Sequence, residues 1–526
     1  MSKQLVFNTE AREKILAGAK VVFDAVSTTL GPRSNNVAIE RPWGTPSVIH
    51  DGVGVAKEID LEDKFENVGA QLIKGAAQRT NDEAGDGTTV TTILTYNIAK
   101  EAHRNIVAGA SPMEVRQGID DAVKSMMTLI DDMAVQLKTD EEIKQIAVIS
   151  AQNEEIGELI AGAIKKLGRD SIITVEESQT TEMSIDFKEG MQFDKGWLNS
   201  YFITDQEKGE AVIPDPYILV TDHKITQMPE FIPFLKKFAE DPQKKSNSLV
   251  IIADEVSGPP LATLIANKLQ GNLNVLVVNT PNYGDNRKSV LEDIAWSTGG
   301  QFISQEAGRK LSDIQLSDFG RADKVVSGKD NTVIVGGKSK KKILDARVKQ
   351  IKGMIDQSEN DFETEKLRER LAKLTSGIAV INVGANSEAE MRELKERVID
   401  AISATKAAIE GGIVVGGEMA LLHASKAIQG DSVGSRVVKK AVIEPFNVLM
   451  RNSGYDPGFM LAKIEGTGVG VDVTDGNTKD LVKEGIMDPA KVVKSAIKNA
   501  SSTAIMMLTT NCIIVEPKDE STGRTD

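Results

Sequence analysis

Apolar residues recur at helical spacing near both ends of this chain, whereas its middle contains short apolar runs of strand length. Between residues 15 and 30 the apolar side chains return every three or four positions, and Gly31-Pro32 then supplies a helix cap and a stop. A second helix is predicted to begin at the glycine-rich turn 85–89. The C-terminal part returns to glycine-punctuated helices, with a closing strand predicted at 512–515.

The central segment predicts a different architecture. Apolar runs at 249–252 and 275–278 flank a helical stretch at 261–269, which is the pattern of a βαβ unit. Farther on, a highly charged helix is predicted at 362–373, and Ser387 to Glu390 form a capping box before the next helix. Because 526 residues are too many for one hydrophobic core, we expect two to four domains and a multidomain α+β fold.

Charge and composition argue against several classes of protein. The net charge of −14 disfavours a nucleic-acid groove, and the basic stretch Lys338 to Lys342 is interpreted as a solvated face. A single cysteine, Cys512, excludes an internal disulfide framework and fits a reducing cytosol. No apolar run approaches the roughly 20 residues that cross a bilayer, and Met1 to Thr9 contains no signal-like apolar segment. We therefore expect a cytoplasmic protein without membrane or nucleic-acid partners.

The turn Gly85-Asp86-Gly87-Thr88-Thr89 is a candidate phosphate site. It places backbone N–H groups and two hydroxyls at a helix N-terminus, where the helix dipole favours an anion. The carboxylate of Asp86 would repel phosphate unless a cation lay between them, which indicates a bridging Mg²⁺. The same five residues also form an ordinary helix cap, and taken alone this remains the more frequent explanation.

Four further features have both a structural and a functional explanation. Thr29 to Pro32 is a helix end followed by a loop, and Asp51 to Val53 is more often a turn than a catalytic site. Asp400 lies about 200° round its helix from Val398, so it cannot share the buried stripe, and a surface carboxylate is the commoner explanation. The glycine-rich run 411–417 suits either close approach to a ligand or simple helix packing.

The order of these and other motifs closely resembles the group I chaperonins, the GroEL-like, bacterial-type sixty-kilodalton family. The resemblance rests on 51–67 leading to Gly85-Asp86-Gly87-Thr88-Thr89, then on Glu189 to Asp194, Tyr283 to Lys288, Glu365 to Leu374 and Gly485 to Pro489. It extends in a single order over nearly the whole chain. The gene could serve a cell or a virus.

The resemblance implies a chaperonin fold of three domains. A mainly α-helical equatorial domain for ATP binding and ring assembly would comprise 1–132 and 410–526. A small α/β intermediate hinge domain would comprise 133–189 and 378–409, and an α/β apical domain for client and lid binding would comprise 190–377. The implied function is that of an ATP-dependent molecular chaperone, a protein-folding ATPase with an isomerase-type role. It would bind non-native proteins at an apolar ring mouth, enclose them, and release them after ATP hydrolysis.

The resemblance also implies roles for particular residues. Asp51 and Asp400 match the two carboxylates that act on the attacking water, and Asp86 matches the Mg²⁺ ligand. ATP and Mg²⁺ are the implied cofactors, with K⁺ as a further candidate. The implied nucleotide contacts are Thr29, Leu30, Gly31, Pro32, Asp86, Gly87, Thr88, Thr89, Gly417, Asp472, Val473 and Asp488.

An apolar group of residues in the middle of the chain has two explanations. By periodicity alone it is more often a domain core. By resemblance it lines the ring mouth that binds non-native clients and a small lid co-chaperonin, in a homo-oligomeric ring that is expected to have seven members. The residues that match the family's apolar mouth are Tyr201, Phe202, Ile232, Leu235, Leu261 and Ile265. Burial of apolar area is non-directional, so such a surface can bind unfolded chains without reading their sequence.

Other positions bear on assembly or depart from the family. Lys195 and Glu388 match an inter-subunit salt bridge, with lysine in place of the usual arginine. Glu418 stands where a third glycine is expected, and His50 where a lysine is usual. Asn447 replaces an arginine that contacts the opposite ring, so single and double rings both remain open. The tail 518–526 lacks the Gly-Met repeats of bacterial members and is predicted to be disordered.

Two alternatives from other classes remain. An ATP-independent holdase or structural ring could keep the fold, although the presence of Asp51, Asp86 and Asp400 argues against it. An unrelated small-molecule phosphotransferase could use the turn 85–89, but this would leave the apolar middle segment unexplained. A likeness in fold does not by itself establish an activity.

Overall fold

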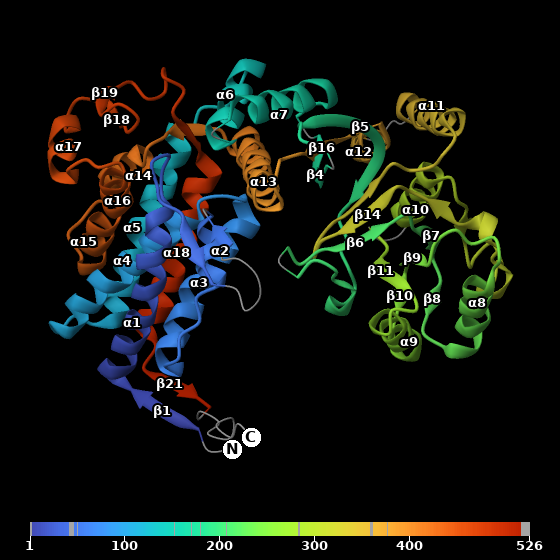
Figure 1. The fold of residues 1–526 in the computed structure, drawn as a ribbon, viewed down its shortest axis with the longest axis horizontal. Helices are drawn as coiled ribbons and strands as arrows, with labels where there is room; N and C mark the ends of the chain where they lie inside the picture. The colour runs from blue at the N-terminus through green and yellow to red at the C-terminus, as the bar shows by residue number, and fades with distance from the viewer. Residues whose placement is uncertain are drawn as a thin grey trace. The chain divides into compact units, whose positions relative to one another are not determined.

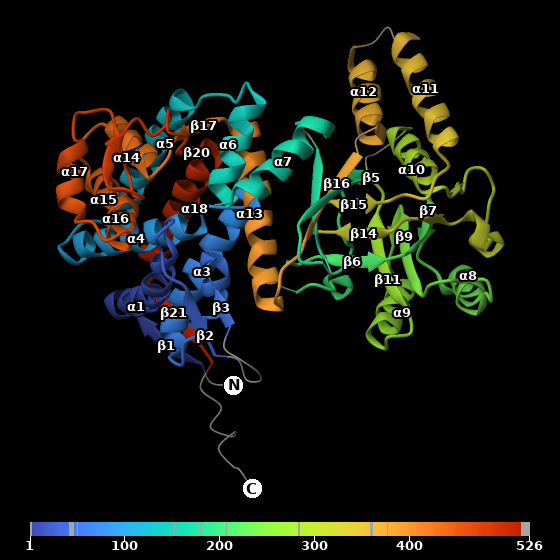
Figure 2. The same cartoon turned by 45° about the horizontal axis from the view of Figure 1, so that its top comes forward.

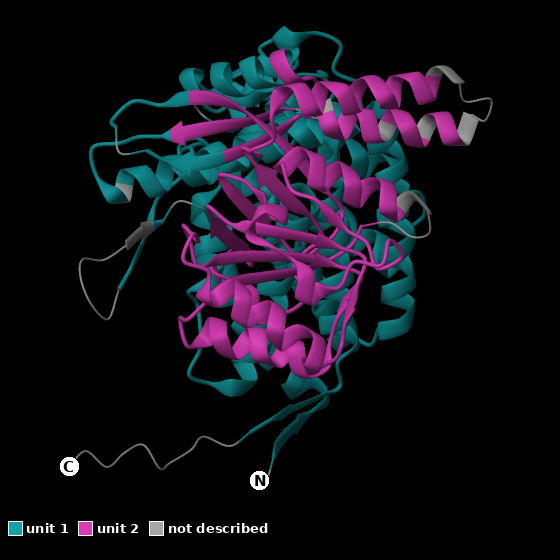
Figure 3. Cartoon of the chain, turned by 90° about the vertical axis from the view of Figure 1, so that its right-hand side faces the viewer, with its two compact units in different colours: residues 1–165, 175–184, 383–526 teal, residues 166–174, 185–382 magenta. Residues whose placement is uncertain are grey.

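The chain forms two compact units (Figure 3). This computed structural model describes residues 3–40, 47–49, 51–151, 153–169, 171–178, 180–206, 208–281, 285–357, 361–375 and 377–516. Unit 1 comprises 1–165, 175–184 and 383–526, and unit 2 comprises 166–174 and 185–382. The segments expected to form an intermediate domain fall mostly in unit 1, and the division into three domains remains a prediction. His50 and the tail 518–526 lie outside the described residues.

Unit 1 is mainly helical (Figure 1). Its helices are α1 (Asn8–Val26), α2 (Gly52–Lys57), α3 (Lys64–Ala84), α4 (Thr88–Val107), α5 (Pro112–Met133), α6 (Asp140–Ala151), α7 (Glu154–Leu167), α13 (Glu388–Gly411), α14 (Met419–Ala424), α15 (Val433–Ala441), α16 (Glu444–Asn452), α17 (Pro457–Ile464) and α18 (Ala490–Thr509), with 3-10 turns η1 (Ser27–Thr29) and η5 (Ser425–Ala427). The last residues of α7 belong to unit 2.

The core of unit 1 joins the two ends of the chain. Helix α18 packs against α3, α4 and α5, so a C-terminal helix lies among N-terminal ones (Figure 1). Most of its residues are buried, including the small side chains Ala496, Ala500 and Ala504. Small residues on a buried helix let neighbouring backbones approach closely, and the apolar area removed from water here is the main stabilising contribution.

The strands of unit 1 form small two-stranded ribbons. They are β1 (Gln4–Phe7) with β21 (Cys512–Val515), β2 (Val37–Ile39) with β3 (Ser47–Ile49), β17 (Ile413–Val415) with β20 (Met487–Pro489), and β18 (Gly470–Asp472) with β19 (Asn477–Lys479). All four pairs are antiparallel. The pairing of β1 with β21 connects the two ends of the chain, and the pairing of β17 with β20 connects segments about 70 residues apart. Both ends of the chain therefore belong to one unit.

Unit 2 contains the sheets of the middle of the chain. One sheet has the order β11-β9-β7-β12, with β13 also pairing with β7; a larger one has the order β4-β16-β5-β15-β14-β6, and β8 pairs with β10. The strands are β4 (Ile172–Glu177), β5 (Ser184–Phe193), β6 (Ala211–Pro214), β7 (Tyr217–Thr221), β8 (Lys224–Ile225), β9 (Ser248–Ala253), β10 (Glu255–Val256), β11 (Asn274–Asn279), β12 (Phe302–Ile303), β13 (Gly320–Arg321), β14 (Lys324–Ser327), β15 (Thr332–Val335) and β16 (Gly377–Val383). Three strand ends belong to unit 1 instead: residues 175–177 of β4, Ser184 of β5 and Val383 of β16.

Unit 2 also contains helices. They are α8 (Met228–Glu240), α9 (Gly258–Leu269), α10 (Asp285–Thr298), α11 (Lys341–Gln357) and α12 (Asp361–Thr375), with 3-10 turns η2 (Ser200–Phe202), η3 (Leu311–Asp313) and η4 (Leu316–Asp318). Two of the helices, α9 and α10, pack on strands of the sheet that includes β7 and β11. The parallel pair β9 and β11 with α9 between them confirms the predicted βαβ unit. Helices α11 and α12 pack side by side as a hairpin (Figure 2).

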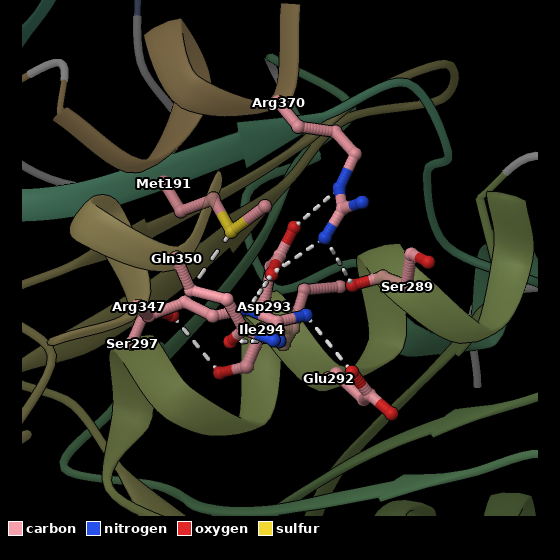
Figure 4. A network of polar contacts seen from close by, with 9 residues as sticks. All are labelled: Met191, Ser289, Glu292, Asp293, Ile294, Ser297, Arg347, Gln350 and Arg370. Carbon is pink, nitrogen blue, oxygen red and sulfur yellow. Dashed lines mark hydrogen bonds and ion pairs between the residues drawn. The ribbon is translucent and has the colours of Figure 1, made fainter. Parts of the chain in front are cut away.

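A buried ion network fastens this hairpin to α10 (Figure 4). Asp293 on α10 is fully buried and accepts hydrogen bonds from Arg347 Nε on α11 and Arg370 Nε on α12, each at 2.8 Å. Arg347 Nη2 also lies 2.8 Å from Glu292 Oε2, and its Nη1 donates to Gln350 at 3.0 Å. One carboxylate thus links three helices, and its charge is compensated by two guanidinium groups.

The predicted helix limits are largely confirmed. The first helix ends in a 3-10 turn just before Gly31, and Ser387 caps α13 by accepting from the backbone N–H of Glu390 at 3.2 Å. The capping box is only partly correct, because Glu390 Oε2 accepts from the backbone N–H of Asn386 rather than that of Ser387. Among the described residues, no helix is both long enough and apolar enough to cross a membrane.

Candidate functional site

Three segments of unit 1 that are distant in sequence meet beside the N-terminus of α4. The hydroxyl of Thr29, at the end of η1, lies 3.2 Å from the hydroxyl of Thr89. Gly52, at the start of α2, is so close that an added Cβ would lie 2.3 Å from Thr89 Oγ1. The segments around Thr29, Gly52 and Thr89, which the sequence analysis considered one by one, therefore lie together. They place hydroxyl groups beside the N-terminus of α4.

The loop after η1 is fastened to the C-terminal segment. Asn452 donates from its side-chain amide to the carbonyl oxygens of Ser27 and Leu30, both at 2.9 Å. Gly31 has a φ of +93°, and Pro32 is exposed. These contacts fix the turn that contains Thr29, Leu30, Gly31 and Pro32 without using their side chains.

Asp51 lies at the start of α2, and Asp86 lies just before the start of α4. Asp51 caps α2 by accepting from the backbone N–H of Gly54 at 2.7 Å. Burial among protein atoms raises the pKa of Asp86; the hydrogen bond from Gly87 N–H at 2.5 Å opposes this, and the charge of Asp51 adds to the increase. Solvent still reaches the Asp86 side chain. It is therefore a carboxylate that protein atoms surround and a cation can approach.

Helix α13, which contains Asp400, packs on the same turn. Gly85 has a φ of +70°, and an added Cβ would lie 2.1 Å from Ser403 Cβ, so α13 packs directly on the turn between α3 and α4. Asp400 is half-buried and precedes Ser403 by about one helical turn, which places both residues on the same side of α13. Ala407, one further turn along, packs with Ala84 at the end of α3.

The segments expected to flank ribose and adenine lie on two of the ribbons. Asp488 pairs in register with Val414, so β20 lies beside β17 and the Gly417 turn that follows it. Val473 is buried in a cluster with Met419, Leu449 and Leu481. Burial acts to raise the pKa of Asp472, but hydrogen bonds from Lys479 and Thr474 outweigh it and hold that pKa below its usual value. The carboxylate of Asp472 is therefore occupied within its own hairpin.

Glu418 stands where the family resemblance predicts a glycine, and its backbone conformation explains why glycine is preferred at this position. Its φ is +65°, a left-handed conformation that glycine adopts freely and glutamate rarely does. Burial, followed by the charges of Asp488 and Asp86, raises the pKa of Glu418 to about 8. Burial and the charge of Asp86 raise the pKa of Asp488 to about 7. Three carboxyl groups therefore lie within electrostatic reach of one another.

This group of residues is suited to hold Mg²⁺ together with a polyphosphate. Among the described residues, no three His, Cys, Asp or Glu side chains lie close enough together to hold a metal ion by themselves. Mg²⁺ is commonly held by one or two carboxylates together with phosphate oxygens and water. Asp86 could provide the carboxylate, and a cation beside it would offset the mutual repulsion of Asp51, Asp86 and Asp488. When bound, Mg²⁺ neutralises charge on the phosphates.

A second candidate site lies on unit 2, where α9 contacts both α8 and η2. Tyr201 is 59% exposed and Ile232 is 40% exposed, whereas Leu235, Leu261 and Ile265 are half-buried against the core. These five residues are called the apolar surface below. Leu269 at the end of α9 is also exposed; it follows Leu261 and Ile265 at intervals of four residues, so helical spacing could have added it to the set.

The expectation for Phe202 needs correction. Its side chain is fully buried in the core of unit 2, so it does not belong to the apolar surface. The neighbouring Tyr201 points outward because η2 is a tight 3-10 turn, in which consecutive side chains diverge. Lys268 fastens this turn to α9 by donating to the carbonyl oxygens of Phe202 at 2.7 Å and Val275 at 3.2 Å. Burial lowers the pKa of Lys268 to about 8.

The two residues of the expected inter-subunit salt bridge lie in different units. Lys195 follows β5 in unit 2, and Glu388 is an exposed residue in the first turn of α13 in unit 1. Their pairing concerns two copies of the chain and remains a prediction.

Comparison with known proteins gives one family over most of the chain. A family model described as the TCP-1/cpn60 chaperonin family matches residues 22–518. Two solved structures are similar over nearly their whole length, both of the chaperonin gp146 from the bacteriophage EL 2 (Pseudomonas aeruginosa) in presence of ATP-BeFx. Crystal form II matches with a TM-score of 0.71 and 20% identity, covering 98% of this chain and 99% of that chain. Crystal form I gives 0.63 and 19%, with the same coverage. At this identity the likeness concerns the fold.

Proposed function

Because the chain belongs to the TCP-1/cpn60 chaperonin family, we propose that it is an ATP-dependent molecular chaperone that binds non-native proteins, encloses them and releases them after ATP hydrolysis. The observation that carries this proposal is the meeting of Thr29, Gly52 and Thr89 beside α4, with α13 packed on the adjoining turn. A phosphate chain needs such a helix N-terminus, and a cation needs an accessible carboxylate, which Asp86 offers.

In the proposed reaction the three carboxylates divide two tasks. Asp86 holds the cation that accompanies the phosphates, and Asp51 and Asp400 orient the water that attacks the terminal phosphate. The structure of the phage chaperonin in presence of ATP-BeFx supports nucleotide binding by this fold. Glycine at 52 and 85 supports the proposal further, because side chains there would displace Thr89 or α13.

We propose that the apolar surface of unit 2 binds the client. An unfolded chain exposes apolar side chains, and their burial against Tyr201 and Ile232 is favourable whatever their order. The same surface is proposed to accept the apolar loop of a small lid protein. Competition between lid and client would then link lid binding to client release.

The client proposal predicts that Tyr201→Glu abolishes capture of an unfolded protein and that Ile232→Ser weakens it about tenfold, since burying an isoleucine contributes about 1.5–3 kcal/mol. Anisotropy of a fluorescent, permanently unfolded client measures both affinities. Met354→Ser is the matched control, because Met354 is also 40% exposed but lies on α11. Equal loss in the control would mean that exposed apolar area anywhere on unit 2 suffices. Unfolding of the Tyr201 variant would show that the residue belongs to the core.

We further propose a homo-oligomeric ring, with seven members as the family resemblance implies. The ribbon of β1 and β21 supports assembly. Leu5 pairs in register with Ile514, and with Phe7 these side chains form an exposed apolar face, whereas Val6 and Ile513 pack towards the core. The opposite face of the ribbon already packs on the core of unit 1, so a second copy of the chain is the expected partner for the exposed apolar face.

The assembly proposal predicts that Ile514→Glu shifts the protein from a large oligomer to single chains, because a carboxylate would be buried without a partner. Sedimentation velocity measures the change. Gln4→Glu is the control, since it adds the same charge to the same ribbon on the other face. An unchanged oligomer in the Ile514 variant would place the subunit contacts elsewhere.

A further inference from the structure

Glu418 occupies a backbone conformation that its side chain does not favour. Among the described residues, three that are not glycine have a positive φ: Asn8, Asp215 and Glu418. Asparagine and aspartate visit this region because their short side chains hydrogen-bond the local backbone, but glutamate gains no such compensation. A residue held in an unfavourable conformation indicates that its side chain has a task at that position.

The neighbours of Glu418 define where that task lies. The backbone N–H of Gly416 donates to the carbonyl of Ile486 at 3.1 Å, two residues before Asp488. Met419 packs with Val471 and Val473. The carboxyl group also lies within electrostatic reach of both Asp488 and Asp86. Glu418 therefore stands between the ribbon segments proposed to face the nucleoside and the turn proposed to face the phosphates.

The chemistry of a nucleotide limits what a carboxyl group can contact there. Phosphate oxygens repel a carboxylate, and the neighbouring charges that raise the pKa of Glu418 are those of two further carboxyl groups, Asp488 and Asp86. Between the phosphates and the base lies the ribose, which is neutral. Its hydroxyls both donate and accept hydrogen bonds, so a carboxyl group can bond to them in either protonation state. Acidic side chains serve this purpose in other nucleotide sites.

We propose that Glu418 is a specificity-determining residue that hydrogen-bonds a ribose hydroxyl of the bound nucleotide and so favours ribonucleotides over deoxyribonucleotides. This inference rests on the proposed function, because it requires ATP to bind at α4. It assigns a role to a side chain at a position where the family resemblance predicts glycine.

The test compares the dissociation constants of ATP, 2′-deoxy-ATP and 3′-deoxy-ATP, each with Mg²⁺, in the wild type and two variants. The wild type is expected to bind ATP about tenfold more tightly than at least one deoxy form, because that form lacks the hydroxyl to which the Glu418 carboxyl group would bond. Glu418→Gly should reduce that preference by about the same factor and raise the melting temperature, because glycine tolerates the positive φ. Glu418→Gln should retain most of the preference, and Glu465→Gln, an exposed residue after α17, should change nothing.

The outcomes separate the inference from the function. If ATP binds but all variants show the same ATP-to-deoxy ratios, the inference is wrong and the proposed function stands. If Glu418→Gly changes the Mg²⁺ dependence of binding while the ratios stay fixed, Glu418 acts on the cation, which also contradicts the inference. Failure of the wild type to bind any of the three nucleotides would contradict the proposed function itself.

Discussion

Asp400→Ala is expected to slow ATP turnover by about 10²-fold or more, because removal of one catalytic group typically has this effect. The affinity of the protein for Mg²⁺-ATP is expected to change little. Asp400 is on α13, about one helical turn before Ser403, which packs on Gly85, and we expect its carboxylate to act from outside the turn 85–89. A residue in that position can orient water at a bound nucleotide but contributes little to holding it. Steady-state turnover and equilibrium binding measure the two effects separately.

Two other carboxylates sharpen this prediction. Asp86→Ala is expected to weaken Mg²⁺-ATP binding itself, since it removes the accessible carboxylate of the turn. Glu393→Ala on α13 should leave both quantities unchanged, because Glu393 is exposed and paired with Arg397. Normal turnover in the Asp400 variant would remove Asp400 from the catalytic role.

Asp293→Ala is expected to destabilise unit 2 by about 3–5 kcal/mol, because Arg347 and Arg370 both lose the buried carboxylate that links them and Arg347 keeps only the more exposed Glu292. The local consequence should be loss of the α11 and α12 hairpin. Hydrogen exchange on the full chain measures it: amides of α11 and α12 should lose protection, while amides of α18 in unit 1 provide the internal reference.

The chain offers a matched control for Asp293. Glu292 precedes it and pairs with the same Arg347, but its side chain is 43% exposed. Glu292→Ala should therefore cost at most about 1 kcal/mol. Equal effects of the two substitutions would mean that burial of the ion network does not determine its contribution.

The sequence located the elements of the fold better than their contacts. Periodicity predicted the helix from residue 15, the βαβ unit and the strand at 512–515, because each depends on local pattern. It could not bring Thr29 to Thr89, since that contact depends on packing between segments 60 residues apart. The order of the motifs supplied this information only through resemblance to a family.

The sequence pattern predicted the solvent exposure of individual side chains least well. Tyr201 and Phe202 are adjacent and both aromatic, yet one is exposed and the other is fully buried, because a 3-10 turn fixed by Lys268 directs them apart. The charged helix at 362–373 gave no sign that Arg370 is buried against Asp293, which lies on a different helix. From the sequence, Glu418 was recognised only as a departure from the glycine that the resemblance predicts. Its positive φ could be found only from the structure.

The central claim is that nucleotide controls client binding, and the most direct measurement is the anisotropy of a labelled unfolded client before and after addition of Mg²⁺-ATP. We predict that the wild type binds the client without nucleotide and releases it when Mg²⁺-ATP is added, whereas Asp86→Ala binds the client and retains it. A client that remains equally bound with and without Mg²⁺-ATP would contradict the account and identify the protein as an ATP-independent holdase.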